Sequence, residues 1–470
     1  MVGKKRISPS LRKVEQDGES EDDVLFLHRK IATTATLKRK NQTKKDVLTL
    51  DRTLLEAARN FDMNSETVMR HMKVSVYALN EVVERCIMEF LPVIPNRLHV
   101  EAVCRRWRRL SLEEMPVTEL DFEQVALRPL LRRNVRLMLE RAKQQLTKLV
   151  LPDITLVDAH IELIVQQQNL RVFRAHRMQK RHFFNILEHC ASLQTLELMD
   201  CRALRLSGQR GWPRDAVALR EVYLNECHFF TNQAARSLIK ICGSSLEKVV
   251  FTGAMSLDSQ VLRDLATYSV KMAKLTISSV NLRDIQTMTE GVGASLRWLD
   301  LSSCRDMSSF SVGDSTNLLH LQVLMLDKTK INDDGLRAIA RVAPSLQYLS
   351  LQDCRVISDD GLATISEGCT NLELVDLKGT AVTDASIEAL EAQCPRLRLV
   401  RVDSCRSVSR EMRRKYNERA LRILKGDKLS KCERIFAERK KIEMVAQTRR
   451  DSESDNESES DRDSDDDYAI

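Results

Sequence analysis

A short apolar pattern that recurs along most of the chain constrains its fold more than any other feature. The pattern has leucine at its first, fourth and sixth positions and cysteine at its ninth, with clear copies starting at Leu193, Leu296 and Leu346. Variants with Val, Ile, Met or Phe at leucine positions start at Leu219, Leu246, Met272, Leu321, Leu372 and Leu397, and weaker copies start at Val117, Leu146 and Leu170. From Leu193 onward the starts lie 24 to 27 residues apart. Such a regular spacing indicates stacked repeats.

Each copy of the pattern predicts a strand followed by a returning helix. The alternating leucines point to one side of an extended chain, and the residues between them point to the other. A hydroxyl or amide side chain stands where the helix of several repeats should begin and would cap its free amide groups; these residues are Thr231, Asn332, Ser358 and Thr383. One such unit cannot bury its own apolar edge, so we expect stacked units that share a continuous core.

The repeats resemble the cysteine-containing class of leucine-rich repeats, including a second cysteine before the next strand at Cys190, Cys242, Cys369 and Cys394. Nine of the twelve cysteines occupy recurring packing positions, and the exceptions are Cys86, Cys104 and Cys432. We therefore interpret the thiols as small apolar residues rather than reactive groups. The predicted fold class is α/β: a leucine-rich-repeat solenoid, or horseshoe, of about twelve repeats over residues 117–409.

The segment before the repeats, residues 76–113, predicts a small all-α domain. Apolar residues recur at helical spacing as far as Pro92, which ends the first helix. A second amphipathic helix over residues 98–110 ends in a basic cluster that contains Trp107. The segment resembles an F-box at Ile87, Phe90, Leu91, Pro92, Val103, Cys104, Arg105 and Trp107, and departs from that motif at Asn80 and Val82. The alternative interpretation is a helical cap on the first repeat.

The F-box resemblance implies a non-catalytic function. F-box proteins dock onto the adaptor of a cullin-based, SCF-type ubiquitin ligase, and their repeats hold the substrate close to the conjugating enzyme. It implies adaptor contacts at Leu79, Val83, Ile87, Phe90, Leu91, Pro92, Val103 and Trp107. The expected partners are the adaptor and cullin subunits and an unknown protein substrate.

The substrate surface is expected on the outward column of five successive strands, where large apolar side chains follow one another. The candidate substrate-binding residues are Trp298, Val323, Tyr348, Leu374 and Leu399, with Met325 in the adjacent column, which also holds Asp300, Ser350, Asp376 and Arg401. An apolar strip bordered by polar residues is typical of an interaction site. The alternative is that residues 410–450 fold back and bury the strip.

The two ends of the chain differ from the rest in composition. Residues 1–46 and 451–470 are predicted to be disordered, residues 47–75 have helical character without an assigned role, and residues 410–450 form a basic helical cap or extension. The last twenty residues contain ten acidic residues and one arginine, a net charge of −9 that leaves +16 on the remainder. Candidate phosphorylation sites in this acidic tail are Ser452, Ser454, Ser458, Ser460 and Ser464.

Several other functions find little support in the sequence. No apolar run approaches the roughly 20 residues that span a bilayer, and no phosphate loop, metal-ligand cluster or catalytic triad spacing is found, so we expect neither an enzyme nor a cofactor. The basic cluster from Lys38 to Lys45 is a candidate nuclear-import signal, and we expect a nuclear or cytoplasmic location. The competing function is a nuclear leucine-rich-repeat scaffold or a chromatin or nucleic-acid-associated protein without ubiquitin transfer.

Overall fold

The computed structural model describes residues 84, 101–123, 132–200, 202, 204–206, 211–213, 217–282, 285, 294–310, 318–426 and 429–443. The chain divides into two compact units, Met1–Ala175 and His176–Ile470. Most of the expected adaptor-binding residues and all the candidate phosphorylation sites lie outside the described residues: Leu79, Val83, Ile87, Phe90, Leu91 and Pro92, and Ser452, Ser454, Ser458, Ser460 and Ser464.

The first unit contains the end of the F-box-like segment and the first three strands. Its elements are α6 (Arg105–Arg109), the π-helix η3 (Leu110–Glu114), β1 (Glu119–Asp121), α7 (Arg132–Arg141), β2 (Lys148–Val150), α8 (Asp158–Val165) and β3 (Val172–His176). The strands pair in parallel, β1 with β2 and β2 with β3.

The second unit continues the alternation of strands and helices. Its strands are β4 (Thr195–Met199), β5 (Glu221–Leu224), β6 (Lys248–Thr252), β7 (Lys274–Ser278), β8 (Trp298–Asp300), β9 (Val323–Met325), β10 (Tyr348–Ser350), β11 (Leu374–Asp376) and β12 (Leu399–Arg401). Its helices are α9 (Lys180–His189), α10 (Asn232–Cys242), the short 3-10 helix η4 (Gly243–Ser245), α11 (Ser259–Tyr268), α13 (Asp333–Val342), α14 (Asp359–Gly368), α15 (Asp384–Gln393) and α16 (Arg410–Lys425). A further helix covers residues 431–443, and we call it the C-terminal helix.

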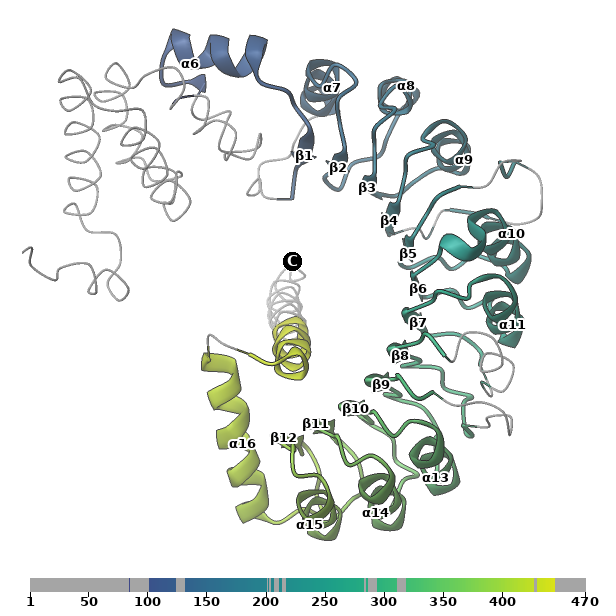
Figure 1. The fold of residues 1–470 in the computed structure, drawn as a ribbon, viewed down its shortest axis with the longest axis vertical. Coiled ribbons are helices and arrows are strands. Elements are labelled where there is room, and N and C mark those ends of the chain that lie inside the picture. Colours follow the sequence, from purple (N-terminus) through teal and green to yellow (C-terminus); the bar gives the residue numbers. More distant parts are fainter. Residues whose placement is uncertain are drawn as a thin grey trace, which may run out of the picture. The chain divides into compact units, whose positions relative to one another are not determined.

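The strands of the second unit form a parallel sheet in which neighbours in sequence are neighbours in space. Pairing runs without interruption from β4 to β12. Helices α10, α11, α13, α14 and α15 lie on one side of this sheet, whereas the C-terminal helix lies on the other side, which we call the inner face (Figure 1). Every strand in the described residues begins two positions after one of the twelve predicted repeat starts. The predicted leucine-rich-repeat solenoid fold is therefore confirmed.

The repeating residues form the core and the helix caps that the sequence predicts. In the repeat that starts at Leu346, the side chains of Leu346, Leu349, Leu351 and Cys354 are completely buried. The predicted caps Thr231, Asn332, Ser358 and Thr383 all precede helices, and each side chain accepts a hydrogen bond from a backbone amide of the first turn. The same local pattern thus produces the same unit in each repeat.

A left-handed backbone residue follows each strand from β3 onward. The residue at the eighth position of the pattern has a positive φ in the repeats that start from Leu170 onward: Arg177, Asp200, Glu226, Gly253, Ser279, Ser303, Lys328, Asp353, Gly379 and Ser404. Outside glycine this conformation costs roughly 1–2 kcal/mol. It aims the amide toward the next repeat, so that Lys328 N–H donates to the Gln352 carbonyl and Asp353 N–H to the Lys378 carbonyl, both at 2.7 Å. Hydrogen bonds between repeats therefore offset the strain.

The repeat cysteines pack as the sequence predicts. Cys190, Cys227, Cys242, Cys304, Cys354, Cys369, Cys394 and Cys405 are free thiols and buried, and Cys201 lies outside the described residues. The thiols of Cys354 and Cys405 donate to the carbonyls of Leu326 and Leu377 in the preceding repeat, at 3.0 and 2.9 Å. Burial raises the pKa of Cys354 to about 11 and that of Cys369 to about 12, which keeps both thiols protonated near neutral pH.

The end of the F-box-like segment differs from the single helix predicted over residues 98–110. Cys104 has an extended backbone, with φ −155° and ψ 163°, and α6 begins after it. The Cys104 Sγ accepts a 3.4 Å hydrogen bond from the Trp107 amide. The helical periodicity does not reveal this break because the thiol acts as the cap of a new, shorter helix.

Candidate binding site on the inner face of the repeats

The sheet register brings the predicted strip together. Trp298, Val323, Tyr348, Leu374 and Leu399 are successive partners across β8 to β12, and so are Asp300, Met325, Ser350, Asp376 and Arg401 in the adjacent column. The two columns therefore lie side by side on the inner face. We call Val323, Met325, Tyr348, Leu374, Leu399, Asp327, Ser350, Asp376, Arg401 and Asp403 the inner-face site.

The strip is covered in the structure described here, and the role of its residues toward a substrate stays a prediction. Val323, Tyr348 and Leu399 are completely buried, and Leu374 and Met325 are only 1% and 4% exposed. The cover is the chain's own C-terminal helix, whose Cys432, Ile435, Phe436 and Ala437 are buried as well. The alternative prediction, that residues 410–450 fold back over the strip, describes the observed arrangement of residues 431–443 (Figure 1). The physical reason is that two apolar surfaces of one chain remove each other from water.

Trp298 differs from the other residues of the strip because it remains partly exposed. It lies on β8, and the ammonium of Lys274 on β7 stands 3.9 Å from the centre of its ring. Such a cation–π contact is favourable where the ammonium is partly desolvated. Burial lowers the pKa of Lys274. Trp298 therefore marks the edge of the covered region.

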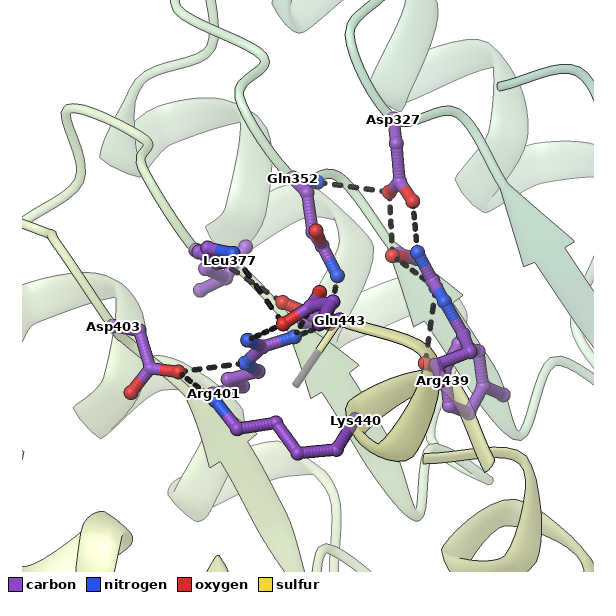
Figure 2. A network of polar contacts seen from close by, with 12 residues as sticks. Asp327, Gln352, Leu377, Arg401, Asp403, Arg439, Lys440 and Glu443 are labelled. Carbon is purple, nitrogen blue, oxygen red and sulfur yellow. Dashed lines mark hydrogen bonds and ion pairs between the residues drawn. The ribbon is translucent and has the colours of Figure 1, made fainter. Parts of the chain in front are cut away.

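An arginine of the C-terminal helix occupies a polar pocket of the inner-face site (Figure 2). Arg439 Nη1 donates to Ser350 Oγ at 2.8 Å and to Tyr348 Oη at 3.2 Å, and its Nη2 pairs with Asp327. Ser350 Oγ and the Gln352 amide both donate to the other oxygen of Asp327, at 2.5 and 3.0 Å. Burial opposes the charge of Arg439, but Asp327 outweighs it and the pKa of the guanidinium is raised. The pocket therefore holds a charged arginine.

A second ionic network surrounds Arg401, only 3% exposed, at the end of the sheet (Figure 2). Its guanidinium contacts Asp376 Oδ2 at 3.2 Å, Asp403 Oδ2 at 2.9 Å and Glu443 Oε2 of the C-terminal helix at 2.7 Å. Lys440 of the same helix contacts Asp403 at 3.0 Å. Buried charges are stable only where each is paired and hydrogen-bonded. The C-terminal helix supplies some of these partners through Glu443 and Lys440.

Burial and ion pairing shift the pKa values of the carboxylates in this network in opposite directions. Burial raises the pKa of Asp376, although Arg401 opposes the shift. Burial alone would raise the pKa of Glu443 too, but the hydrogen bonds and charge of Arg401, with Lys378 and Lys440, lower it to about 2. Asp403 behaves in the same way, since Arg401 and Lys440 outweigh burial and lower its pKa. Glu443 and Asp403 are therefore ionised anchors for the helix.

A reciprocal cap fixes where the C-terminal helix begins. The Glu433 amide donates to Ser430 Oγ at 3.2 Å, and the Ser430 amide donates to Glu433 Oε2 at 2.7 Å. This is a capping box, and the sequence Ser430-Lys431-Cys432-Glu433 carries its signature. The sequence reasoning missed it. Glu433 also pairs with Arg398 at 3.2 Å, next to β12, so the cap both starts the helix and attaches it to the sheet.

The described adaptor-binding candidates lie in the first unit and are not equivalent. Trp107 is completely buried and Val103 is partly exposed. Trp107 therefore packs the domain interior, and only Val103 offers a side chain to the surface. Arg106 Nη2 lies 2.8 Å from Glu84 Oε2, which joins the two predicted helices of the F-box-like segment. Their roles toward an adaptor stay predictions.

The described residues contain no group of three or more His, Cys, Asp or Glu side chains placed to hold a metal ion. None of the helices in that part of the chain combines the length and apolar character needed to cross a bilayer. The residues of the inner-face site offer recognition by apolar contact, hydrogen bonds and charge.

Comparison with known proteins bears on the family. A family model described as a leucine-rich repeat matches residues 317–340 and 342–366. F-box/LRR-repeat protein 4 of Bos taurus is 31% identical to this chain over 105 residues, which are 22% of this chain and 17% of that protein. The chain thus spans less than a fifth of the length of this relative.

Two solved structures have remote similarity. One comes from the crystal structure of the Rad7 and Elc1 complex in yeast, with 15% identity, a TM-score of 0.38, and coverage of 84% of this chain and 96% of that one. The other comes from the Drosophila Toll–Spatzle complex, with 15% identity, a TM-score of 0.37, and coverage of 56% and 34%. The fold and the family-model match show leucine-rich repeats in this chain, and the Bos taurus relative supports a resemblance to the F-box/leucine-rich-repeat family.

Proposed function

We propose that this chain is the substrate-recognition subunit of a cullin-based ubiquitin ligase. Residues 76–113 dock the adaptor, and the inner face of the repeats binds the substrate. The chain itself does no chemistry, because its task is to hold a substrate lysine close to a conjugating enzyme and so raise its effective concentration. We also propose that the chain acts in the nucleus or the cytoplasm.

The observation that carries the proposal is that the inner-face site already holds a polypeptide helix. Apolar residues of β9 to β12 accept its apolar side, and Asp327 and Arg401 pair with its charged residues. A surface with a buried apolar centre and satisfied charges has the composition of a protein-binding site. This favours a receptor for proteins over a binder of small molecules or nucleic acid.

A second support is the attachment of the F-box-like segment to the first repeat. Arg141 of α7 pairs with Glu101 and donates to Ser111 Oγ at 3.0 Å, while Ser111 donates to Glu101 at 2.5 Å. Arg141 and Glu101 are 14% and 12% exposed, so water screens the pair little. A receptor needs such a fixed connection, because a defined distance between docking segment and repeats positions the substrate.

Affinity purification of the full chain from cells tests the proposal. We expect the adaptor and cullin subunits to co-purify with the wild type and to be lost from Ile87→Ala/Leu91→Ala, which removes two apolar contacts that the F-box resemblance implies. Leu421→Ala is the matched control, because Leu421 of α16 is 55% exposed and lies outside that segment. Trp107→Ala is unsuitable because this side chain is buried and its loss would destabilise the fold.

The outcomes separate the competing functions. The proposal that the chain is a ligase subunit is supported if adaptor and cullin co-purify with the wild type and the control but not with the double variant. A wild type that recovers neither subunit refutes it. Histones or RNA in their place would favour the chromatin or nucleic-acid-associated alternative.

A further inference from the structure

The contacts of the C-terminal helix follow one helical stripe. Six residues of one stripe pack on or pair with the inner face, namely Cys432, Ile435, Phe436, Arg439, Lys440 and Glu443, and Ala437 and Glu433 add contacts beside it. The spacing of the six, 3, 1, 3, 1 and 3 positions, places all of them on one side of an α-helix. The first half of the stripe is apolar and the second half is charged. The stripe is thus a compact recognition pattern, comparable to the anchors of helices that bind in grooves.

The inner face complements this stripe position by position. Val323, Tyr348, Leu374 and Leu399 form the apolar column that the stripe covers, while Asp327 receives Arg439. Asp403 forms an ion pair with Lys440, and Arg401 forms one with Glu443. An apolar cap would need none of these ion pairs to cover an apolar column. The charged contacts add selectivity, because a helix without them would leave buried charges unpaired.

The C-terminal helix is also suited to leave the site. Its described part, residues 431–443, packs an apolar side on the inner face, and the stability of such a helix comes mainly from this packing. Docking and helix formation are therefore coupled, and the helix should open as one unit. The side chains of Arg439, Lys440 and Glu443 keep 24–30% of their surface exposed. On release, their partners on the sheet regain water, which limits the cost of opening.

From these features we propose that the inner-face site is a receptor for a basic amphipathic helix and that the C-terminal helix is its tethered internal ligand. The partner it fits carries the same stripe: apolar residues, followed three positions later by an arginine that enters the pocket of Asp327, Ser350 and Tyr348. The substrate displaces the internal helix by competing for this pocket. This identification of the partner as a substrate rests on the proposed function, whereas the helix-binding site does not.

Tethering explains why such a site is occupied at rest. The C-terminal helix begins at residue 431, six positions after α16 ends at Lys425. A ligand joined by so short a segment has a high effective concentration, on the order of millimolar. A free helix with the same contacts therefore competes poorly with the internal helix. It displaces the internal helix only if the free helix binds more tightly or if the internal helix is weakened. The site thus discriminates against weak partners.

The test uses the full chain and a fluorescein-labelled synthetic peptide of residues 429–443, with binding followed by anisotropy. Phe436→Ala/Arg439→Ala opens the site from the helix side and leaves the sheet unchanged. We expect this variant to bind the peptide at least tenfold more tightly than the wild type does. Adding Asp327→Asn should remove the gain, and a peptide carrying Arg439→Gln should bind weakly. Arg414→Ala, an exposed position of α16, is the control and should behave as the wild type.

Hydrogen exchange of the wild type provides a second measurement that does not depend on a variant. Residues 431–443 should exchange together and faster than α13 to α15 while the repeats stay closed. Exchange as slow as that of β9 to β12 would show a permanent cap and overturn the proposal, as would equal peptide binding by the wild type and the opened variant. Neither measurement involves the adaptor, so tight peptide binding with no adaptor co-purification would refute only the ligase function.

Discussion

Arg439 Nη1 donates a 3.2 Å hydrogen bond to Oη of Tyr348, a residue 91 positions earlier in the chain. The tyrosine belongs to the apolar column of the inner face, and the arginine belongs to the charged half of the C-terminal helix. Their contact joins apolar packing and polar recognition at one point, because the tyrosine ring packs in the apolar column and its hydroxyl accepts a hydrogen bond from the arginine. Four predictions follow from this network and from the packing of the repeats.

The ring of Tyr348 should contribute more to the free energy of unfolding than its hydroxyl does. Tyr348→Phe removes one acceptor of Arg439 and should lower the free energy of unfolding by about 0.5–1.5 kcal/mol. Tyr348→Ala leaves a cavity in a completely buried site and should cost about 3–5 kcal/mol. Urea unfolding of the full chain measures both. Tyr223→Ala, on the inner face of β5 where the side chain is half-buried, should cost less, and equal losses at the two tyrosines would contradict the assigned packing.

The Arg401–Asp376 pair should show strong coupling. Arg401→Met leaves Asp376, 1% exposed, without its opposite charge and should destabilise the chain by about 3–5 kcal/mol. Arg401→Met/Asp376→Leu removes both charges and should recover much of this loss. A double-mutant cycle by urea unfolding gives the coupling energy. Additive losses would mean that the two side chains do not stabilise each other.

Glu443 should make the docking of the C-terminal helix sensitive to acid. Its pKa in the folded chain is about 2, below the value of about 4.3 for an unperturbed glutamate. Its contribution is therefore complete above about pH 5 and is lost as the pH falls toward 2. The raised pKa of Asp376 acts in the opposite direction, because protonation there relieves a buried charge.

Glu443→Gln isolates this contribution. The difference in unfolding free energy between wild type and Glu443→Gln should be constant from pH 8 to about 5 and should shrink between pH 5 and 3. Subtracting the two curves removes the effect of Asp376 and of all other carboxylates. A difference that stays constant down to pH 3 would show that the folded-state pKa is not depressed.

The repeat thiols should resist alkylation while the chain is folded. Burial raises the pKa of Cys304, Cys354 and Cys394 to about 11, and only the thiolate reacts rapidly. Iodoacetamide at pH 8 should therefore modify Cys104, which is partly exposed, well before these three. Mass spectrometry of the digested chain reads the order. Modification of the repeat thiols as fast as of Cys104 would rule out their packing role, and unfolding in urea should equalise the rates.

The repeats could be predicted from the sequence because each is determined within a short stretch of chain. The alternation around Leu349 sets the strand, Ser358 caps the helix that follows, and Cys354 fits the turn between them. The register follows as well, since equivalent positions of equivalent units align when the units stack. The columns that contain Tyr348 and Asp376 were therefore visible in the sequence.

The occupant of those columns was decided only by the tertiary structure. The capping box of Ser430 and Glu433 and the stripe that contains Glu443 were readable locally. Nothing near them in the sequence identifies the pocket, 89 to 112 residues away, that Arg439 enters. Periodicity identifies which side of a helix is apolar and not which surface will cover it. That choice depends on the path of the chain after α16 and on the summed fit of apolar and charged contacts, which exist only once the repeats have stacked.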